Sequence, residues 1–169
     1  MVMGRNFAVP PPWSGHRIYP DDTHRPEDLV MLPVAMTHES SKIHVRPATR
    51  TAFIEMAEAA RKNHISLVVD SGYRSVWYQR KIFHKFLEDD AEFEDIAKTI
   101  APPGYSEHML GRVVDLVPSD ASFSRTKAYD WLEKNAHKYH FKESYPRDSK
   151  GGYAWEPWHW KYTGREGEK

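Results

Sequence analysis

The chain has 169 residues, 24 of them basic and 24 acidic, and it contains no cysteine. This length is enough for one domain with a hydrophobic core. The balanced charge argues against nucleic acid or an anionic membrane as the main partner. Because cysteine is absent, disulfide bonds and thiolate metal ligands are excluded, and any bound metal must be held by histidine, aspartate or glutamate.

The beginning of the chain differs in composition from the rest. Residues 1–25 are rich in proline, glycine, aspartate and aromatic residues, which predicts an extended N-terminal arm laid over the domain with Trp13 and Tyr19 as anchors. This arm has no apolar h-region, so a secretory signal peptide is not expected. Residues 26–164 are predicted to form the domain and residues 165–169 a tail, and no window is apolar enough to span a bilayer.

Apolar periodicity predicts several helices and one buried strand. A helix is expected at residues 49–63, followed by a strand, ISLVV, at residues 65–69. Further helices are expected at residues 75–87, 92–100 and 124–135.

Two of these helices have predicted capping residues. Ser75 and Ser124 stand at the beginning of their helices, where a hydroxyl accepts a hydrogen bond from a free backbone N–H. In the helix that Ser75 begins, the residues predicted to face inward are Ile82, Phe83, Phe86 and Leu87.

The segment SEHMLGRVVD, at residues 106–115, carries a histidine and an aspartate in an unusual setting. His108 and Asp115 lie seven residues apart, a spacing that suits a turn leading into a strand better than one helix face. Gly111 between them allows the chain to turn sharply. Asp115 lies in the apolar run VVDLV, where a carboxylate is costly unless it is paired or bound to a metal.

A second motif, EPWHW, at residues 156–160, supplies another histidine and another acid. Period-two alternation places His159 and Lys161 on one face of a strand and the neighbouring aromatic residues on the other. Glu156 precedes His159 by three residues. Its carboxylate is therefore free to act as a general base on a metal-bound water.

Together, the two motifs supply the groups of a hydrolytic zinc site. Such a site uses three nitrogen or oxygen ligands, an open position for water and a carboxylate that moves the proton. Taken alone, each residue has a simpler explanation, as a surface or core histidine, a salt-bridged acid or aromatic packing. We favour zinc because these explanations must account at once for an acid in a valine-rich strand, a glycine turn and a Glu-x-x-His pair.

The chain resembles the VanY-type D-alanyl-D-alanine carboxypeptidases of zinc peptidase family M15, which also includes L,D-carboxypeptidases. The similarity extends from about Pro26 to Gly164. The family patterns S-x-H-x-x-G-x-A-x-D, E-x-W-H and S-G-Y-R-S are matched at Ser106, His108, Gly111 and Asp115, at Glu156, Trp158 and His159, and at Ser71 to Ser75.

Two residues depart from the family pattern. Val113 stands where alanine is usual, and its larger side chain is expected to narrow the pocket. His140 stands where glycine is usual. Neither change removes a ligand.

The resemblance implies a role for each matched residue. His108, Asp115 and His159 would bind zinc, and Glu156 would be the catalytic base and later the acid. Arg74, at the end of the predicted strand, would position the substrate and stabilise the oxyanion, which suits its planar and permanently charged guanidinium. The alternative for Arg74 is a structural salt bridge. Weaker candidates for hydrogen bonds to the substrate are Ser71, Tyr73, Gln79 and Ser106.

The predicted fold is α+β, with a small antiparallel sheet that carries the zinc ligands and with helices on one side. The resemblance implies the same architecture, which DD-peptidases share with the Hedgehog signalling domain. It further implies hydrolysis of the terminal peptide bond of peptidoglycan stem peptides, with release of a D-amino acid. We expect a monomer.

Three alternatives to this function stay open. They are a D-Ala-D-Ala dipeptidase, an endolysin-type peptidoglycan endopeptidase and a silent zinc-binding module. Glu156 argues against the silent module, because a structural site has no use for an unligated acid. The sequence does not decide between a D,D and an L,D bond. The resemblance implies the periplasm or the cell exterior, whereas the missing signal peptide leaves the cytoplasm open.

Overall fold

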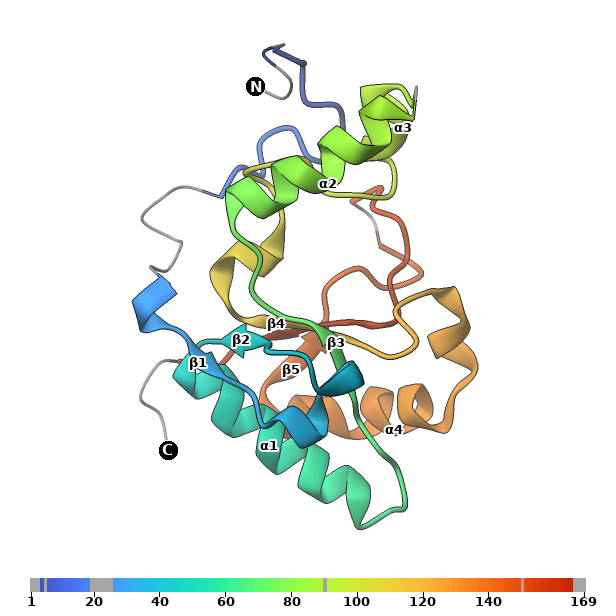
Figure 1. Ribbon diagram of the computed structural model, residues 1–169. Helices are drawn as coiled ribbons and strands as arrows, with labels where there is room; N and C mark the ends of the chain where they lie inside the picture. The colour runs from blue at the N-terminus through green and yellow to red at the C-terminus, as the bar shows by residue number, and fades with distance from the viewer. Residues whose placement is uncertain (1–3, 5, 19–25, 90, 150, 166–169) are drawn as a thin grey trace.

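The computed structural model describes residues 4, 6–18, 26–89, 91–149 and 151–165 (Figure 1). Tyr19, predicted to anchor the arm, lies outside the described residues. The main sheet has four antiparallel strands in the order β3-β4-β6-β5, which are Val69–Ser71, Val113–Leu116, His159–Tyr162 and Phe141–Glu143. A second sheet pairs β1, Val30–Met31, with β2, His44–Val45. The α-helices are α1, Pro47–Arg61, α2, Val76–Glu88, α3, Phe93–Ala97, and α4, Lys127–Asn135.

The predicted α+β class with a small antiparallel sheet is confirmed. Short 3-10 helices connect the strands and α-helices, including one at Glu107–Leu110 and one at Ala136–Tyr139. In the described part of the chain, no helix combines the length and the apolar character that a bilayer crossing requires.

Helix α1 follows the predicted pattern closely. Pro47 occupies its first turn, where proline is favoured because its missing N–H would have no partner. The apolar residues at spacings of three and four are buried along one face. The strand predicted at residues 65–69 begins only at Val69, after a turn in which His64 has a positive φ of 59°.

The cap of α2 is confirmed and that of α4 is not. The Ser75 hydroxyl accepts a 3.1 Å hydrogen bond from the Tyr78 N–H. At α4 the capping residue is Thr126, whose hydroxyl accepts from the Tyr129 N–H at 3.1 Å. Ser124 instead lies in a separate 3-10 helix, Ala121–Arg125, which shortens α4 at its beginning.

The predicted inward face of α2 is too wide. Phe83 is buried, but Phe86 is 41% exposed. The reason is that this helix rests on only a few residues, mainly those of the short α3, so that the single row through Gln79 and Phe83 is buried. The predicted third helix is likewise shorter than expected and spans Phe93–Ala97.

The helices lie on both sides of the main sheet, not on one. Helices α1 and α4 pack on one face together with alternate strand residues such as Val114, Leu116 and Trp160. Helices α2 and α3 pack with the N-terminal arm in a second cluster, on the other side of the sheet in Figure 1. The strand residues that alternate with the core, Asp115 and His159 among them, therefore face the space toward α2 and α3.

The departure at His140 has a structural consequence. His140 ends the 3-10 helix Ala136–Tyr139 with a positive φ of 59°, in the left-handed region that favours glycine. This conformation costs a non-glycine residue about 1–2 kcal/mol. A glycine would avoid this cost. Its greater conformational freedom in the unfolded chain would, however, lower the free energy of unfolding by about 0.4–1 kcal/mol.

We therefore expect His140→Gly to raise the free energy of unfolding by about 0.5–1 kcal/mol. Denaturant unfolding of the two proteins measures the difference. The control is His137→Gly, in the same 3-10 helix but with an ordinary φ, which should lower the stability. A His140→Gly variant that is less stable than the parent would contradict the argument.

Candidate active site

Two strands and one tight turn bring together His108, Asp115 and His159. The 3-10 helix Glu107–Leu110 ends at Gly111, whose φ is 63°. A Cβ on Gly111 would lie 2.9 Å from Leu29 Cδ2, so glycine suits both the backbone and the space. The chain then enters β4, where Asp115 pairs directly with His159 of β6. The predicted turn into a strand is therefore observed.

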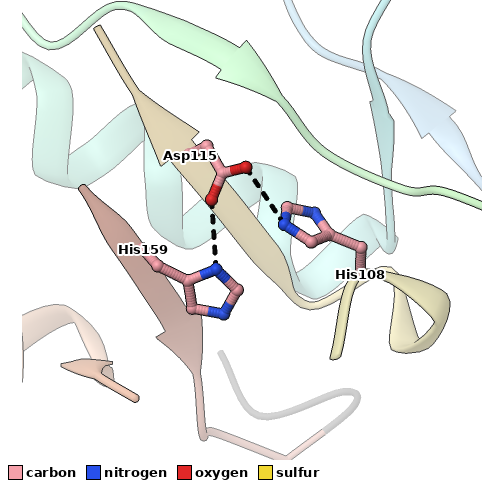
Figure 2. A group of neighbouring side chains, drawn as sticks. All are labelled: His108, Asp115 and His159. Atoms are coloured by element: carbon pink, nitrogen blue, oxygen red, sulfur yellow. Dashed lines mark hydrogen bonds and ion pairs between the residues drawn. The ribbon is translucent and has the colours of Figure 1, made fainter. Parts of the chain in front are cut away.

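The three side chains point toward one another from the turn and the two strands (Figure 2). His108 Nε2 lies 3.1 Å from Asp115 Oδ2, and His159 Nδ1 lies 3.1 Å from Asp115 Oδ1. Each residue is only 3% exposed, and one donor atom from each lies within 4.8 Å of the others. Four-coordinate zinc with ligands at about 2.0–2.1 Å requires ligand separations of roughly 3.3 Å, so the donor set fits this ion.

Hydrogen bonds to the far side of each imidazole fix which nitrogen is available. His108 Nδ1 lies 2.6 Å from the Gly72 carbonyl oxygen and must donate to it, which leaves Nε2 as an acceptor. His159 Nε2 lies 3.2 Å from Glu107 Oε2, which leaves Nδ1. Both free nitrogens face Asp115. Metal-binding histidines are typically oriented in this way by a carbonyl or a carboxylate.

Glu107 is a residue of the site that the sequence interpretation missed. Besides contacting His159, it accepts a 2.6 Å hydrogen bond from Lys161 Nζ at Oε1. Burial favours its neutral form, but the hydrogen bonds and charges of His159 and Lys161 hold the Glu107 pKa well below its usual range. Two features of the sequence could have indicated this role. Glu107 directly precedes His108 in the first motif, and the predicted face shared by His159 and Lys161 offers an acid two partners.

The electrostatics of the three side chains suit a cation. Burial opposes ionisation of Asp115, but His108 and His159 outweigh it and keep the Asp115 pKa well below its usual range. Burial lowers the pKa of His108, so this imidazole is neutral. Burial also opposes a charge on His159, yet its hydrogen bonds to Asp115 and Glu107 raise the His159 pKa to about 9. The surrounding carboxylates thus attract positive charge to the position of His159.

Glu156 lies beside the three donor groups without belonging to their compact set. Its Oε2 is 3.5 Å from His159 Nδ1, and its backbone N–H is anchored by the Tyr145 carbonyl oxygen. Burial raises the pKa of Glu156 to about 7. A carboxyl group with a pKa near neutrality can both accept and return a proton, as a general base and acid must.

Arg74 is bonded within the site. Its Nη2 donates to Asp115 Oδ2 at 2.6 Å, and its Nε donates to Ser71 Oγ at 2.8 Å. The residue follows the end of β3, as predicted, and it lines the cavity beside Glu156. Its ion pair thus orients Asp115, while the guanidinium stays accessible to a substrate.

The remaining predicted residues divide into two groups. Gln79, 1% exposed, donates from Nε2 to the Ala101 carbonyl oxygen at 2.7 Å, and its Oε1 has no partner among the described residues. Gln79 and Ser106 both line the cavity. Ser71 and Tyr73 do not, and instead line a neighbouring hollow of about 390 Å³ together with Arg74.

The cavity has a volume of about 160 Å³. Val113 is fully buried and is not among the lining residues, so its larger side chain does not set the width of the pocket as expected. The lining residues come from the sheet, the arm, helix α2, the segment after α3 and the turn that carries His108. The lining residues that do not belong to the sheet include Trp13 of the arm and Thr99, Ile100 and Ala101, which follow α3.

We expect Arg74→Lys to lower kcat/KM by about tenfold to a hundredfold with little change in melting temperature. Lysine keeps the charge but cannot contact Ser71, Asp115 and a substrate at the same time with a planar fork. Steady-state kinetics and melting curves on the zinc-loaded variant measure both effects. Arg74 would be purely structural if the variant melted earlier but kept its kinetics.

Comparison with known proteins gives a consistent result. The family model of VanY, D-alanyl-D-alanine carboxypeptidase, matches residues 42–165. The D-alanyl-D-alanine carboxypeptidase of Enterococcus faecalis (strain ATCC 700802 / V583) is 32% identical over 122 residues, which are 66% of this chain and 46% of the relative. The protein YodJ of Bacillus subtilis (strain 168) is 31% identical over 156 residues, or 86% of this chain and 57% of the relative.

Among solved structures, the LdcB LD-carboxypeptidase superposes with a TM-score of 0.76 and 31% identity, covering 86% of this chain and 72% of that chain. The chain spans about half the length of the curated relatives it matches. The family match includes the His108, Asp115, Glu156 and His159 positions. The chain therefore belongs to the VanY family of D-alanyl-D-alanine carboxypeptidases.

Proposed function

We propose that the protein is a zinc-dependent carboxypeptidase that hydrolyses the terminal peptide bond of peptidoglycan stem peptides and releases a D-amino acid. The observation that carries the proposal is the buried donor set of His108, Asp115 and His159 with the unligated Glu156 beside it. The activity for which the family and the Enterococcus faecalis relative are named supports the class of substrate.

The donor set is suited to zinc by its chemistry. Two imidazole nitrogens and one carboxylate oxygen are ligands that catalytic zinc uses, zinc binding displaces the proton that His159 otherwise holds, and the cavity leaves room beside them. A zinc ion held there supplies a Lewis acid and a means of activating water at neutral pH. Because the ligands and Glu156 come from one chain, a monomer is sufficient.

The side chains of this protein then perform the proton transfers. Glu156 Oε2 takes a proton from the attacking water, whose oxygen forms a bond with the carbonyl carbon of the terminal peptide bond. When the carbon–nitrogen bond breaks, the same carboxyl group returns the proton to the leaving amine. Arg74 and Gln79 provide the donor and acceptor groups that hold the peptide in the cavity.

The size of the cavity favours action at a chain end. Its volume of about 160 Å³ is well below the roughly 300–1,000 Å³ of sites that enclose drug-sized ligands. One small residue at the end of a peptide fits such a space better than an internal peptide segment does. Because the proposed substrate is a peptidoglycan stem peptide, we propose that the protein acts in the periplasm or outside the cell.

Purified stem peptides test the proposal. The zinc-loaded protein is incubated separately with a tetrapeptide stem, a pentapeptide stem and free D-Ala-D-Ala, and the products are identified by mass spectrometry. Loss of one terminal D-amino acid from a stem is the expected result, and the length that is cut distinguishes a D,D from an L,D enzyme. Cleavage of the dipeptide alone, or of no peptide, would overturn the proposal.

A further inference from the structure

Trp13 is a cavity-lining residue that lies outside the family match, which begins at residue 42. It belongs to the N-terminal arm, and it is only 6% exposed. Its indole Nε1 donates a 2.7 Å hydrogen bond to the carbonyl oxygen of Ala97, at the end of α3. The arm therefore contributes a fixed side chain to the cavity and does more than cover the core.

Aromatic neighbours hold Trp13 in place relative to the candidate metal ligands. Its ring packs edge-on against Tyr153, with centroids 4.8 Å apart, and against Tyr145 at 6.1 Å. The ring of Tyr145 in turn lies 4.9 Å from that of His159. Two ring contacts thus connect the arm to the proposed zinc site. A change at Trp13 therefore alters the lining of the cavity that also holds His108, Asp115 and His159.

We propose that Trp13 is a specificity-determining residue that restricts the released residue to a small D-amino acid such as D-alanine. This inference rests on the proposed function. The released residue is the last one of the peptide, so the cavity can be closed beyond that residue. The rest of the peptide must extend out of the cavity. The rigid wall of Trp13, Ile100 and Ala101 therefore suits the released residue. It offers apolar contact to a methyl group and little room for a longer side chain.

Two stem peptides that differ only in their last residue, D-alanine or D-leucine, test this inference. Both have the length that the parent protein cuts, and kcat/KM is measured for each with the zinc-loaded protein. The parent is expected to prefer D-alanine by at least about tenfold, within the range that apolar pockets achieve by size. Trp13→Ala is expected to reduce this ratio by about tenfold or more, because the wall recedes.

Two further variants separate specificity from stability. Trp13→Phe keeps an aromatic ring but is smaller and loses the bond to Ala97, so it should shift the ratio in the same direction if Trp13→Ala does not fold. Phe7→Ala is the matched control, because Phe7 stacks on Phe93 with centroids 4.4 Å apart in the same arm and does not line the cavity. It should leave the ratio unchanged.

The outcomes distinguish this inference from the proposed function. If the parent releases no terminal residue from either peptide, the proposed function fails and the inference fails with it. If the parent releases D-alanine but folded Trp13 variants keep the parent ratio, the inference alone is wrong. A ratio that changes equally in Phe7→Ala would also overturn it, because the effect would then come from general loosening of the arm.

Discussion

Glu156→Gln is expected to lower the turnover of stem peptides by about a hundredfold or more, the scale of a general base. Glutamine has nearly the same shape, but its neutral amide cannot take the proton from water as the Glu156 carboxylate does. The variant should keep its zinc, because Glu156 lies outside the compact donor set. Steady-state kinetics and elemental analysis on the same preparation measure both properties.

Glu143→Gln is the matched control for that variant. Glu143 is also a partly buried acid whose pKa is raised by burial, but it contacts Tyr129 and Trp155 and does not line the cavity. Its turnover should stay close to that of the parent. If Glu156→Gln hydrolyses stem peptides at the parent rate, Glu156 is not the base and the silent zinc-binding module becomes the better interpretation.

His159→Ala is expected to remove most of the zinc and, with it, the activity. The substitution deletes one of three donor groups, and it leaves Asp115 and Glu107 with only their pairs to Arg74 and Lys161. Glu107→Gln should have a smaller effect, about a tenfold to hundredfold loss of zinc affinity, because it changes only the partner that orients His159.

Titration of the metal-free proteins with zinc measures this gradation. His84→Ala is the control, since His84 is an exposed residue of α2 far from the donor set in sequence and pairs with Glu88. It should bind zinc as the parent does. Full zinc retention in His159→Ala and in His108→Ala would contradict the assignment of the ligands.

The local features of this site could be predicted from the sequence. The turn at Gly111 and the strand after it follow from residues that are neighbours in the chain. The face shared by His159 and Lys161 follows from strand alternation alone. In the structure both side chains contact Glu107, which shows that they do lie on one face. An acid in an apolar strand was informative because burial of a lone carboxylate is costly.

Features that depend on tertiary packing could not be predicted in this way. Helix α2 is amphipathic, but its periodicity does not predict that its contact with α3 is narrow. Phe86 is exposed because this contact does not reach it. Nor does periodicity tell on which side of a sheet a helix lies. Trp13 was expected to anchor the arm, yet its place in the cavity wall depends on the positions of α3 and Tyr145.

Zinc removal and return test the central claim most directly. The protein is treated with a chelator until elemental analysis shows almost no zinc, and release of the terminal D-amino acid from a stem peptide is followed before and after zinc is returned. We expect release to stop in the metal-free protein and to return with about one equivalent of zinc per chain, as one three-ligand site requires. Release at the parent rate from protein that contains no zinc would contradict the account.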